Sequence, residues 1–238
     1  MTRRRWIADE FAANRAALTG AHADHLIRVL RAQLGQTFDI ATAETVRRGR
    51  ITAILDHRVE FELGEEVQAA GRRLEITLAL AIFKFDRMEW AVEKCTELGV
   101  SRIVPLIAQR TDSHLAAASA KRVERWRRIA RQASEQSRRI SPPEISVPLK
   151  LREAVTLRGA TRIVLAESEE QLSLKQALWP HSREDDVLLA VGSEGGWTPA
   201  EVKLFQQSGW IAASLGDATL RAETAAIAAI AVVSSELY

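Results

Sequence analysis

Residues 186–201 read DVLLAVGSEGGWTPAE, and this stretch decides the fold. Its first six residues, which are apolar from Val187 onward, have the length of a strand. Thr198, Pro199 and Glu201 then supply a helix start: a capping hydroxyl, a proline at the first helical position, and a partner acid three residues after the cap. A fully apolar strand that passes through a glycine-rich turn into a helix is typical of a parallel sheet.

The same alternation continues on both sides of this stretch. Short apolar runs predict further strands at residues 75–82, 102–108, 162–166 and 210–215. Helical spacing predicts a helix over 86–98, opened by Asp86 and Glu89 in the manner of a capping box, and a long basic helix over 118–139. Strands that alternate with helices predict an α/β fold whose parallel sheet is covered on both faces.

The N-terminal part follows a different pattern. Brief β-rich runs occur at residues 37–41, 50–55 and 59–63, and a helix is predicted over 24–31. Several short strands separated by turns favour a small β-barrel. The boundary falls near residues 71–73, so we expect one domain over 1–71 and a second over 74–238.

The glycines of the opening stretch predict a ligand site. Gly192, Gly195 and Gly196 let the backbone approach a ligand closely and adopt positive φ, and they follow the carboxyl end of a strand, where open parallel sheets bind ligands. A tight turn is the alternative, although one glycine would suffice for it. The spacing matches neither a P-loop nor the dinucleotide-binding fingerprint, which weakens the case for hydride transfer.

A second candidate stretch is LGDATLRAETAA, residues 215–226. Arg221 and Glu223 lie at the start of the last predicted helix. An arginine there opposes the helix macrodipole, which favours a functional role over a structural one. A surface pair between Arg221 and Glu223, or a solvated arginine, is the alternative.

The charge of the chain points only weakly to a nucleic acid. The net charge is +2, but 27 of the 33 basic residues are arginine, whose planar fork grips phosphate. Residues 121–139 form the most basic window, with Trp126 inside it, and Arg3 to Arg5 with Trp6 form a weaker cluster. Either cluster could bind along a phosphate backbone, and for residues 121–139 a solvated helix face is the alternative.

Other function classes are disfavoured. The chain has no run of 18 apolar residues and no secretory signal after its first arginines, so we expect a cytoplasmic protein without a membrane span. Its one cysteine, Cys95, lies on an apolar helix stripe and is predicted to be a buried, inert thiol. The five histidines show no zinc-ligand spacing, and no metal is expected.

Five segments together resemble the ribosomal RNA small subunit methyltransferase E family of the SPOUT superfamily. They are DHLIRVLR (24–31), DRMEWAVEKCTELGV (86–100), RIARQASEQSRR (128–139), GSEGGWTPAE (192–201) and LGDATLRAETAA (215–226). The resemblance implies a PUA-like RNA-binding barrel, followed by an α/β methyltransferase domain with a C-terminal trefoil knot. It also implies a homodimer that uses S-adenosylmethionine to methylate N3 of a uridine in the 16S ribosomal RNA of the 30S subunit.

The resemblance assigns site residues by position. Its catalytic candidates are Arg221, Glu194 and Glu223. Its cofactor loops contain Leu165, Ala166, Glu167, Gly192, Ser193, Glu194, Gly195, Gly196, Leu215, Gly216, Leu220, Arg221 and Thr224. Basic residues placed to contact RNA are Arg3, Arg4, Arg28, Arg31, Arg128, Arg131, Arg138 and Arg139.

This sequence departs from the family pattern at three of its loop positions. Ser193 replaces a usual proline, Asp217 a residue that is commonly basic, and Ala222 a threonine.

The mechanism that the resemblance suggests leaves the proton acceptor open. Arg221 would stabilise negative charge on the uracil oxygens, and either Glu194 or Glu223 would receive the N3 proton. Two other functions stay open: a nucleotide-dependent enzyme acting on a small molecule, and a non-catalytic RNA-binding module.

Overall fold

The computed structural model describes residues 5–42, 45–69, 74–179 and 186–237. The chain divides into two compact units, each of which is treated by itself. The first unit comprises Met1–Arg72 and Arg131–Pro142, and the second comprises Arg73–Ala130 and Pro143–Tyr238.

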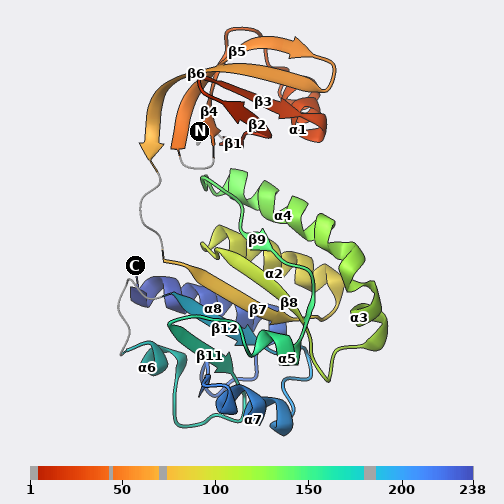
Figure 1. The fold of residues 1–238 in the computed structure, drawn as a ribbon, viewed down its shortest axis with the longest axis vertical. Coiled ribbons are helices and arrows are strands. Elements are labelled where there is room, and N and C mark those ends of the chain that lie inside the picture. Colours follow the sequence, from red (N-terminus) through yellow and green to blue (C-terminus); the bar gives the residue numbers. More distant parts are fainter. Residues whose placement is uncertain (1–4, 43–44, 70–73, 180–185, 238) are drawn as a thin grey trace. The chain divides into compact units, whose positions relative to one another are not determined.

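The second unit is built on a parallel sheet (Figure 1). Within the described ranges it has seven strands, which run side by side in the order β10-β8-β7-β12-β11-β13, with β9 paired to β8. Their bounds are β7 Ile76–Ala81, β8 Arg102–Ile107, β9 Glu144–Ile145, β10 Leu149–Lys150, β11 Thr161–Leu165, β12 Val187–Val191 and β13 Ile211–Ala213. The predicted α/β fold with a parallel sheet is confirmed.

Both faces of this sheet are buried. Alternate residues of a strand point to opposite faces, so Leu78 and Leu80 enter one core cluster while Ala79 and Ala81 enter the other. The first cluster includes residues of α2 (Phe85–Glu97), α4 (Val123–Gln136), α6 (Leu174–Leu178) and α8 (Ala222–Leu237). The second includes residues of α5 (Leu151–Ala154) and α7 (Pro199–Gln207). Two buried faces explain why the strands are apolar nearly throughout.

The sheet order brings three strand ends together. β11 lies between β12 and β13, and all three are parallel, so their carboxyl ends lie at one edge. Val164 pairs with Ala190 of β12 and with Ala212 of β13. The loops that leave these strands begin with Ala166, Gly192 and Ser214. Because the strands are neighbours, the three loops lie next to one another.

The first unit is a mainly antiparallel sheet (Figure 1). Its strands follow the order β1-β4-β5-β6-β3-β2 in the part of the chain that the structure describes. Their bounds are β1 Trp6–Ile7, β2 Glu10–Ala12, β3 Arg15–Thr19, β4 Thr37–Ala41, β5 Thr45–Leu55 and β6 Arg58–Ala69. Trp6, Leu18, Leu26, Ile40 and Phe61 are among its core residues. The predicted strands at 37–41, 50–55 and 59–63 are confirmed, although β5 and β6 are longer than predicted.

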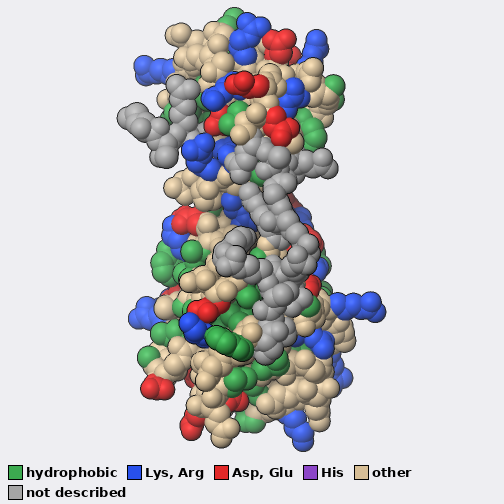
Figure 2. All heavy atoms as spheres, turned by 90° about the vertical axis from the view of Figure 1, so that its left-hand side faces the viewer, with side chains coloured by type: hydrophobic (Ala, Val, Ile, Leu, Met, Phe, Trp, Pro, Cys, Tyr) green, Lys and Arg blue, Asp and Glu red, His purple; other side chains and the backbone are tan. Residues whose placement is uncertain are grey.

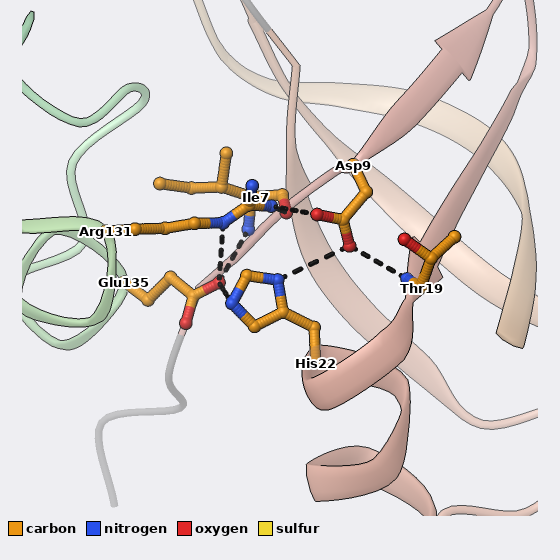
Figure 3. A network of polar contacts seen from close by, with 6 residues as sticks. All are labelled: Ile7, Asp9, Thr19, His22, Arg131 and Glu135. Carbon is orange, nitrogen blue, oxygen red and sulfur yellow. Dashed lines mark hydrogen bonds and ion pairs between the residues drawn. The ribbon is translucent and has the colours of Figure 1, made fainter. Parts of the chain in front are cut away.

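A largely buried polar network links distant parts of the first unit (Figure 3). The Arg131 Nη2 atom lies 2.9 Å from Asp9 Oδ1, and His22 Nδ1 lies 3.3 Å from Asp9 Oδ2. The Ile7 N–H donates to Glu135 Oε1 over 3.4 Å, while the side chain of Glu135 is wholly buried. Residues 131–135 are thus bound to strand β1 and its neighbours by charge as well as by packing.

The surface of the first unit mixes both charges. On the face drawn in Figure 2, basic and acidic side chains are interspersed over this unit. The ion pairs agree with that picture, since Arg58 lies near Glu10 and Glu60, and Arg50 near Glu62. Exposed pairs of this kind contribute little stability.

Three local predictions need correction. The helix predicted over 24–31 begins and ends earlier: it consists of the short helix α1 (Gly20–Asp24) followed by a π-helix, η1 (His25–Val29). The long basic helix is divided into α3 (Ser113–Ser119), a 3₁₀ turn η2 (Ala120–Arg122) and α4. The capping box of α2 is wrong: the helix begins at Phe85 with Lys84 as its cap, so Asp86 lies inside its first turn. Glu89 instead forms a two-pronged ion pair with Arg125 at 2.5 and 2.7 Å.

Two further expectations can be compared with the structure. No helix among the described residues is long and apolar enough to cross a membrane. Cys95 is fully buried on α2, and burial raises the pKa of its thiol to about 12. The predicted burial of this thiol is confirmed, and its inertness stays a prediction.

Candidate functional site

A pocket of about 250 Å³ lies where β11, β12 and β13 end. Three segments of the second unit form most of its wall: 165–168 after β11, 191–197 after β12, and 213–220 after β13. Side chains from the start of α8 and the middle of α7 complete the wall, together with Arg110. The pocket therefore occupies the position at which open parallel sheets bind ligands.

The glycine loop is shaped by tight backbone contacts. A Cβ atom on Gly192 would lie 3.2 Å from the Cα of Gly196, so any other residue there would have to push the two arms of the loop apart by a few tenths of an ångström. Gly196 has a φ of +65°, and its N–H donates to the Ser193 carbonyl over 2.8 Å. The loop turns on itself before the chain enters α7.

The start of α7 fixes the far end of this loop. Thr198 is the cap and accepts from the Glu201 N–H, while Glu201 Oε2 accepts from the Thr198 N–H over 2.8 Å. The other carboxylate oxygen of the buried Glu201 accepts from the Gln109 N–H over 2.7 Å. The predicted helix start is confirmed, and it also ties the glycine loop to the segment after β8.

Arg110 lies beside the loop. Its Nη1 donates to the carbonyl of Gly195 and, over 3.4 Å, to that of Trp197. A guanidinium in this place satisfies carbonyl oxygens of a bent loop and brings positive charge to the pocket wall.

Two predicted catalytic acids meet at one arginine. Arg87 Nη1 lies 2.8 Å from Glu194 Oε1, and Arg87 Nε lies 3.7 Å from Glu223 Oε1. Glu223 is in the first turn of α8, where a carboxylate is favoured by the helix dipole. Its Oε2 is buried and accepts no hydrogen bond from the described residues.

Most of the predicted cofactor residues border the pocket. Glu194, Arg221 and Thr224 do not line it, and the other ten do: Leu165, Ala166, Glu167, Gly192, Ser193, Gly195, Gly196, Leu215, Gly216 and Leu220. Arg221 is exposed and directly precedes α8, where its carbonyl accepts from the Ala225 N–H over 2.8 Å. No ion pair between Arg221 and Glu223 is present among the described residues.

The predicted RNA-contacting arginines differ in accessibility. Arg28, Arg31 and Arg128 are exposed. Arg138 Nη2 lies 3.4 Å from Asp39 Oδ2, Arg131 belongs to the network with Asp9, and Arg139 is only 9% exposed. Arg3 and Arg4 lie outside the described residues. Phosphate contacts by Arg131 or Arg139 would therefore compete with bonds and packing inside the first unit.

Sequence reasoning missed three residues of the site. Arg87 lies in the first turn of α2, far from both loops along the chain, so no spacing rule connects it to them. Arg110 follows the carboxyl end of β8, and this position could have marked it as a candidate, because ligands bind beyond the carboxyl ends of parallel strands. Trp197 belongs to the quoted glycine stretch, but only the fold shows that its ring reaches the pocket.

Comparison with known proteins gives the family. A family model described as an RNA methyltransferase domain matches residues 71–234. The ribosomal RNA small subunit methyltransferase E of Synechocystis is 33% identical over 228 residues, which are 92% of this chain and 73% of that protein.

Two solved structures share the whole fold. A putative methyltransferase from Legionella pneumophila with bound S-adenosylmethionine matches with a TM-score of 0.86 and 28% identity, covering 99% of this chain and 98% of that one. A ribosomal RNA small subunit methyltransferase E from Neisseria gonorrhoeae, bound to S-adenosylmethionine, gives a TM-score of 0.85 and 29% identity, covering 98% and 97%.

These matches extend over both units of the chain rather than over the methyltransferase sheet alone. The matched regions include the five segments that carry the family resemblance, so the predicted family is confirmed. The chain belongs to the ribosomal RNA small subunit methyltransferase E family of RNA methyltransferases.

Proposed function

We propose that this protein transfers the methyl group of S-adenosylmethionine to N3 of one uridine in 16S ribosomal RNA. The observation that carries the proposal is the pocket at the ends of β11, β12 and β13, whose wall comes from the three segments that the family resemblance assigns to the cofactor. Family membership supplies the RNA methyltransferase class.

The residues of the pocket fit this cofactor. Leu165, Val191, Leu215 and Leu220 offer apolar surface for an adenine ring, and loop backbone offers donors and acceptors at the same wall. The Ser193 hydroxyl is buried against the pocket and has no hydrogen-bond partner among the described residues. A buried hydroxyl without a partner is costly, and a polar ligand in the pocket would remove that cost.

The protein's contribution to the reaction is alignment and charge stabilisation. Bound S-adenosylmethionine supplies an activated methyl group on a sulfonium. The loops around the pocket fix that group in place, and such positioning contributes on the order of 7–11 kcal/mol. Arg221, exposed at the start of α8, stabilises the negative charge that the uracil oxygens gain as N3 loses its proton.

The remaining parts of the proposal concern the first unit and the assembly. The domain over residues 1–71 acts as a PUA-like RNA-binding barrel, and the methyltransferase domain over 74–238 carries a trefoil knot. Two copies form a homodimer, which works on the 30S subunit in the cytoplasm. Exposed Arg28, Arg31 and Arg128 contact phosphates, so binding weakens steeply with salt. The target uridine leaves its stack to reach the pocket.

One experiment tests the proposal directly. The protein is incubated with labelled S-adenosylmethionine and 30S subunits that lack the modification, and the methylated nucleotide is mapped. We expect label at N3 of a single uridine. Label at another atom, or none with either subunits or free 16S ribosomal RNA, would contradict it. Tight binding of NAD or ATP in place of S-adenosylmethionine would favour a nucleotide-dependent enzyme.

A further inference from the structure

The arrangement of Arg87, Glu194 and Glu223 distinguishes the two candidate acids. Arg87 comes from α2, Glu194 from the glycine loop and Glu223 from α8, so three separate segments of the second unit converge on one guanidinium. The contact with Glu194 is a short hydrogen bond of 2.8 Å, whereas the closest approach to Glu223 is 3.7 Å. Arg87 is therefore bound to the loop acid and attracted to the helix acid.

Accessibility separates the acids further. The side chain of Glu194 is 38% exposed, and that of Glu223 is 6% exposed. Glu194 also stands between Ser193 and Gly195, both of which line the pocket. A nucleobase that approaches the pocket can touch Glu194, while Glu223 is covered.

We propose that Glu194 receives the N3 proton of the uridine and that Arg87 is the positioning residue that holds it, anchored in turn by Glu223. The proposal rests on the proposed function. In the step itself the N3–H bond breaks and the proton moves to the Glu194 carboxylate. The N3 electron pair forms a bond to the methyl carbon, and the bond from that carbon to sulfur breaks with its electrons left on sulfur. Glu194 then loses the proton to water.

The charges explain why Arg87 is needed. Without it, Glu194 and Glu223 would be two neighbouring carboxylates with no cation bound to either among the described residues, and like charges repel. With it, one oxygen of Glu194 is bound to a cation, and the side chain remains 38% exposed. Among the described residues, Glu194 is ion-paired with Arg87 from α2 and, through Arg87, linked to Glu223 from α8, while Arg110 binds the carbonyl of the neighbouring Gly195.

Four variants test the assignment: Glu194→Gln, Glu223→Gln, Arg87→Ala and Arg87→Lys. Methyl transfer to 30S subunits is measured as kcat and KM against pH, and the Kd for S-adenosylmethionine and the Tm are measured alongside. Glu75→Gln is the matched control, because Glu75 is exposed at the opposite end of the sheet, just before β7.

We expect Glu194→Gln to lower kcat by about 10²–10⁴, the usual contribution of a general base, with little change in the Kd for S-adenosylmethionine. Its rate should keep rising with pH as the uracil ionises in solution, whereas the unchanged protein's rate levels off. Arg87→Ala and Glu223→Gln should lower kcat less, roughly threefold to thirtyfold, since the acceptor is still present. Arg87→Lys should recover part of the loss.

Other results would overturn the assignment. A larger kcat loss in Glu223→Gln than in Glu194→Gln, at equal Tm, would make Glu223 the acceptor. A Glu194→Gln variant whose activity loss follows a weakened Kd for S-adenosylmethionine would make Glu194 a cofactor ligand. If the unchanged protein methylates an atom other than N3, the proposed function fails; if it methylates N3 and Glu194→Gln is normal, only this assignment fails.

Discussion

The indole Nε1 of Trp197 donates a hydrogen bond to the carbonyl oxygen of Leu165, 3.0 Å away. Leu165 is the last residue of β11, and Trp197 closes the glycine loop that follows β12, so this bond joins two walls of the pocket. Trp197 is only 8% exposed, and its ring packs edge-on against Phe205 with centroids 5.0 Å apart. A single side chain thus sets the spacing of the two loops.

Replacing Trp197 by phenylalanine should loosen the pocket. The aromatic packing is largely kept, but the buried Leu165 carbonyl loses its donor, which costs about 1–3 kcal/mol. We expect a lower Tm and a higher Kd for S-adenosylmethionine, measured by thermal unfolding and by titration.

Trp210→Phe is the matched control. Its Nε1 donates to the Val155 carbonyl over 3.0 Å in an equally buried setting, but neither residue lines the pocket. A similar loss of Tm with an unchanged Kd is expected. Equal effects of both variants on the Kd would show that the Trp197 bond acts only through general stability.

Ser193→Ala should change stability and affinity in opposite senses. The hydroxyl is buried without a partner in the described structure, and such a group costs about 1–3 kcal/mol. Its removal should leave the Tm of the free protein unchanged or raise it. If the hydroxyl binds the cofactor, the Kd for S-adenosylmethionine should rise about threefold to tenfold, the value of one hydrogen bond. A lower Tm with normal affinity would mean that the hydroxyl has a structural role instead.

Arg128→Gln should weaken RNA binding in a salt-dependent way. Arg128 is exposed on α4, and no ion pair of it is present among the described residues. If it contacts a phosphate, the slope of log K against log salt concentration should fall by about 0.7–0.9.

Arg125→Gln, one helical turn away, is the control for that prediction, because Glu89 already neutralises its charge. It should change the slope less. Equal slopes in both variants and the unchanged protein would exclude this face of α4 from the RNA contact.

The sequence was most informative where local rules decide the structure. The strand, the glycines and the capping residues of 186–201 each act over a few neighbours, so β12, the loop and the start of α7 were all predictable. The cap of α2 was not, because Glu89 is taken by Arg125, thirty-six residues away. Strands β1 to β3 lack a strong alternating pattern and are held by pairing with distant partners such as β6.

The site shows the same limit. The loops after β12 and β13 could be named from motifs, since each carries its own glycines, but their neighbours in space could not. Arg87 reaches Glu194 across 107 positions of sequence, and Trp197 reaches Leu165 across 32. The order β7-β12-β11-β13 sets both distances, and that order is a property of the whole sheet.

The network around Asp9 predicts how stability depends on pH (Figure 3). Burial acts to raise the pKa of Asp9, but hydrogen bonds from His22 and the Thr19 N–H, with the charge of Arg131, outweigh it and leave the pKa below its ordinary value. A carboxyl whose pKa is lowered on folding stabilises the protein above the unfolded pKa of about 3.9, and the contribution disappears as the pH falls through the lower folded value. Asp9→Asn should therefore cost about 1–3 kcal/mol at pH 7, the value of hydrogen bonds to a charged group, and progressively less as the pH falls below the unfolded pKa of about 3.9.

Urea unfolding of both proteins at several pH values measures this difference, which isolates Asp9 from the other carboxyls that titrate in acid. Glu62→Gln is the control in the same unit, because its ion pair with Arg50 is exposed on both sides and should contribute nothing measurable. A cost of Asp9→Asn that stays constant from pH 7 to pH 3 would mean that the side chain acts through packing. A cost of Asp9→Asn that grows toward low pH would contradict the prediction, since it would require the pKa of Asp9 to be raised on folding.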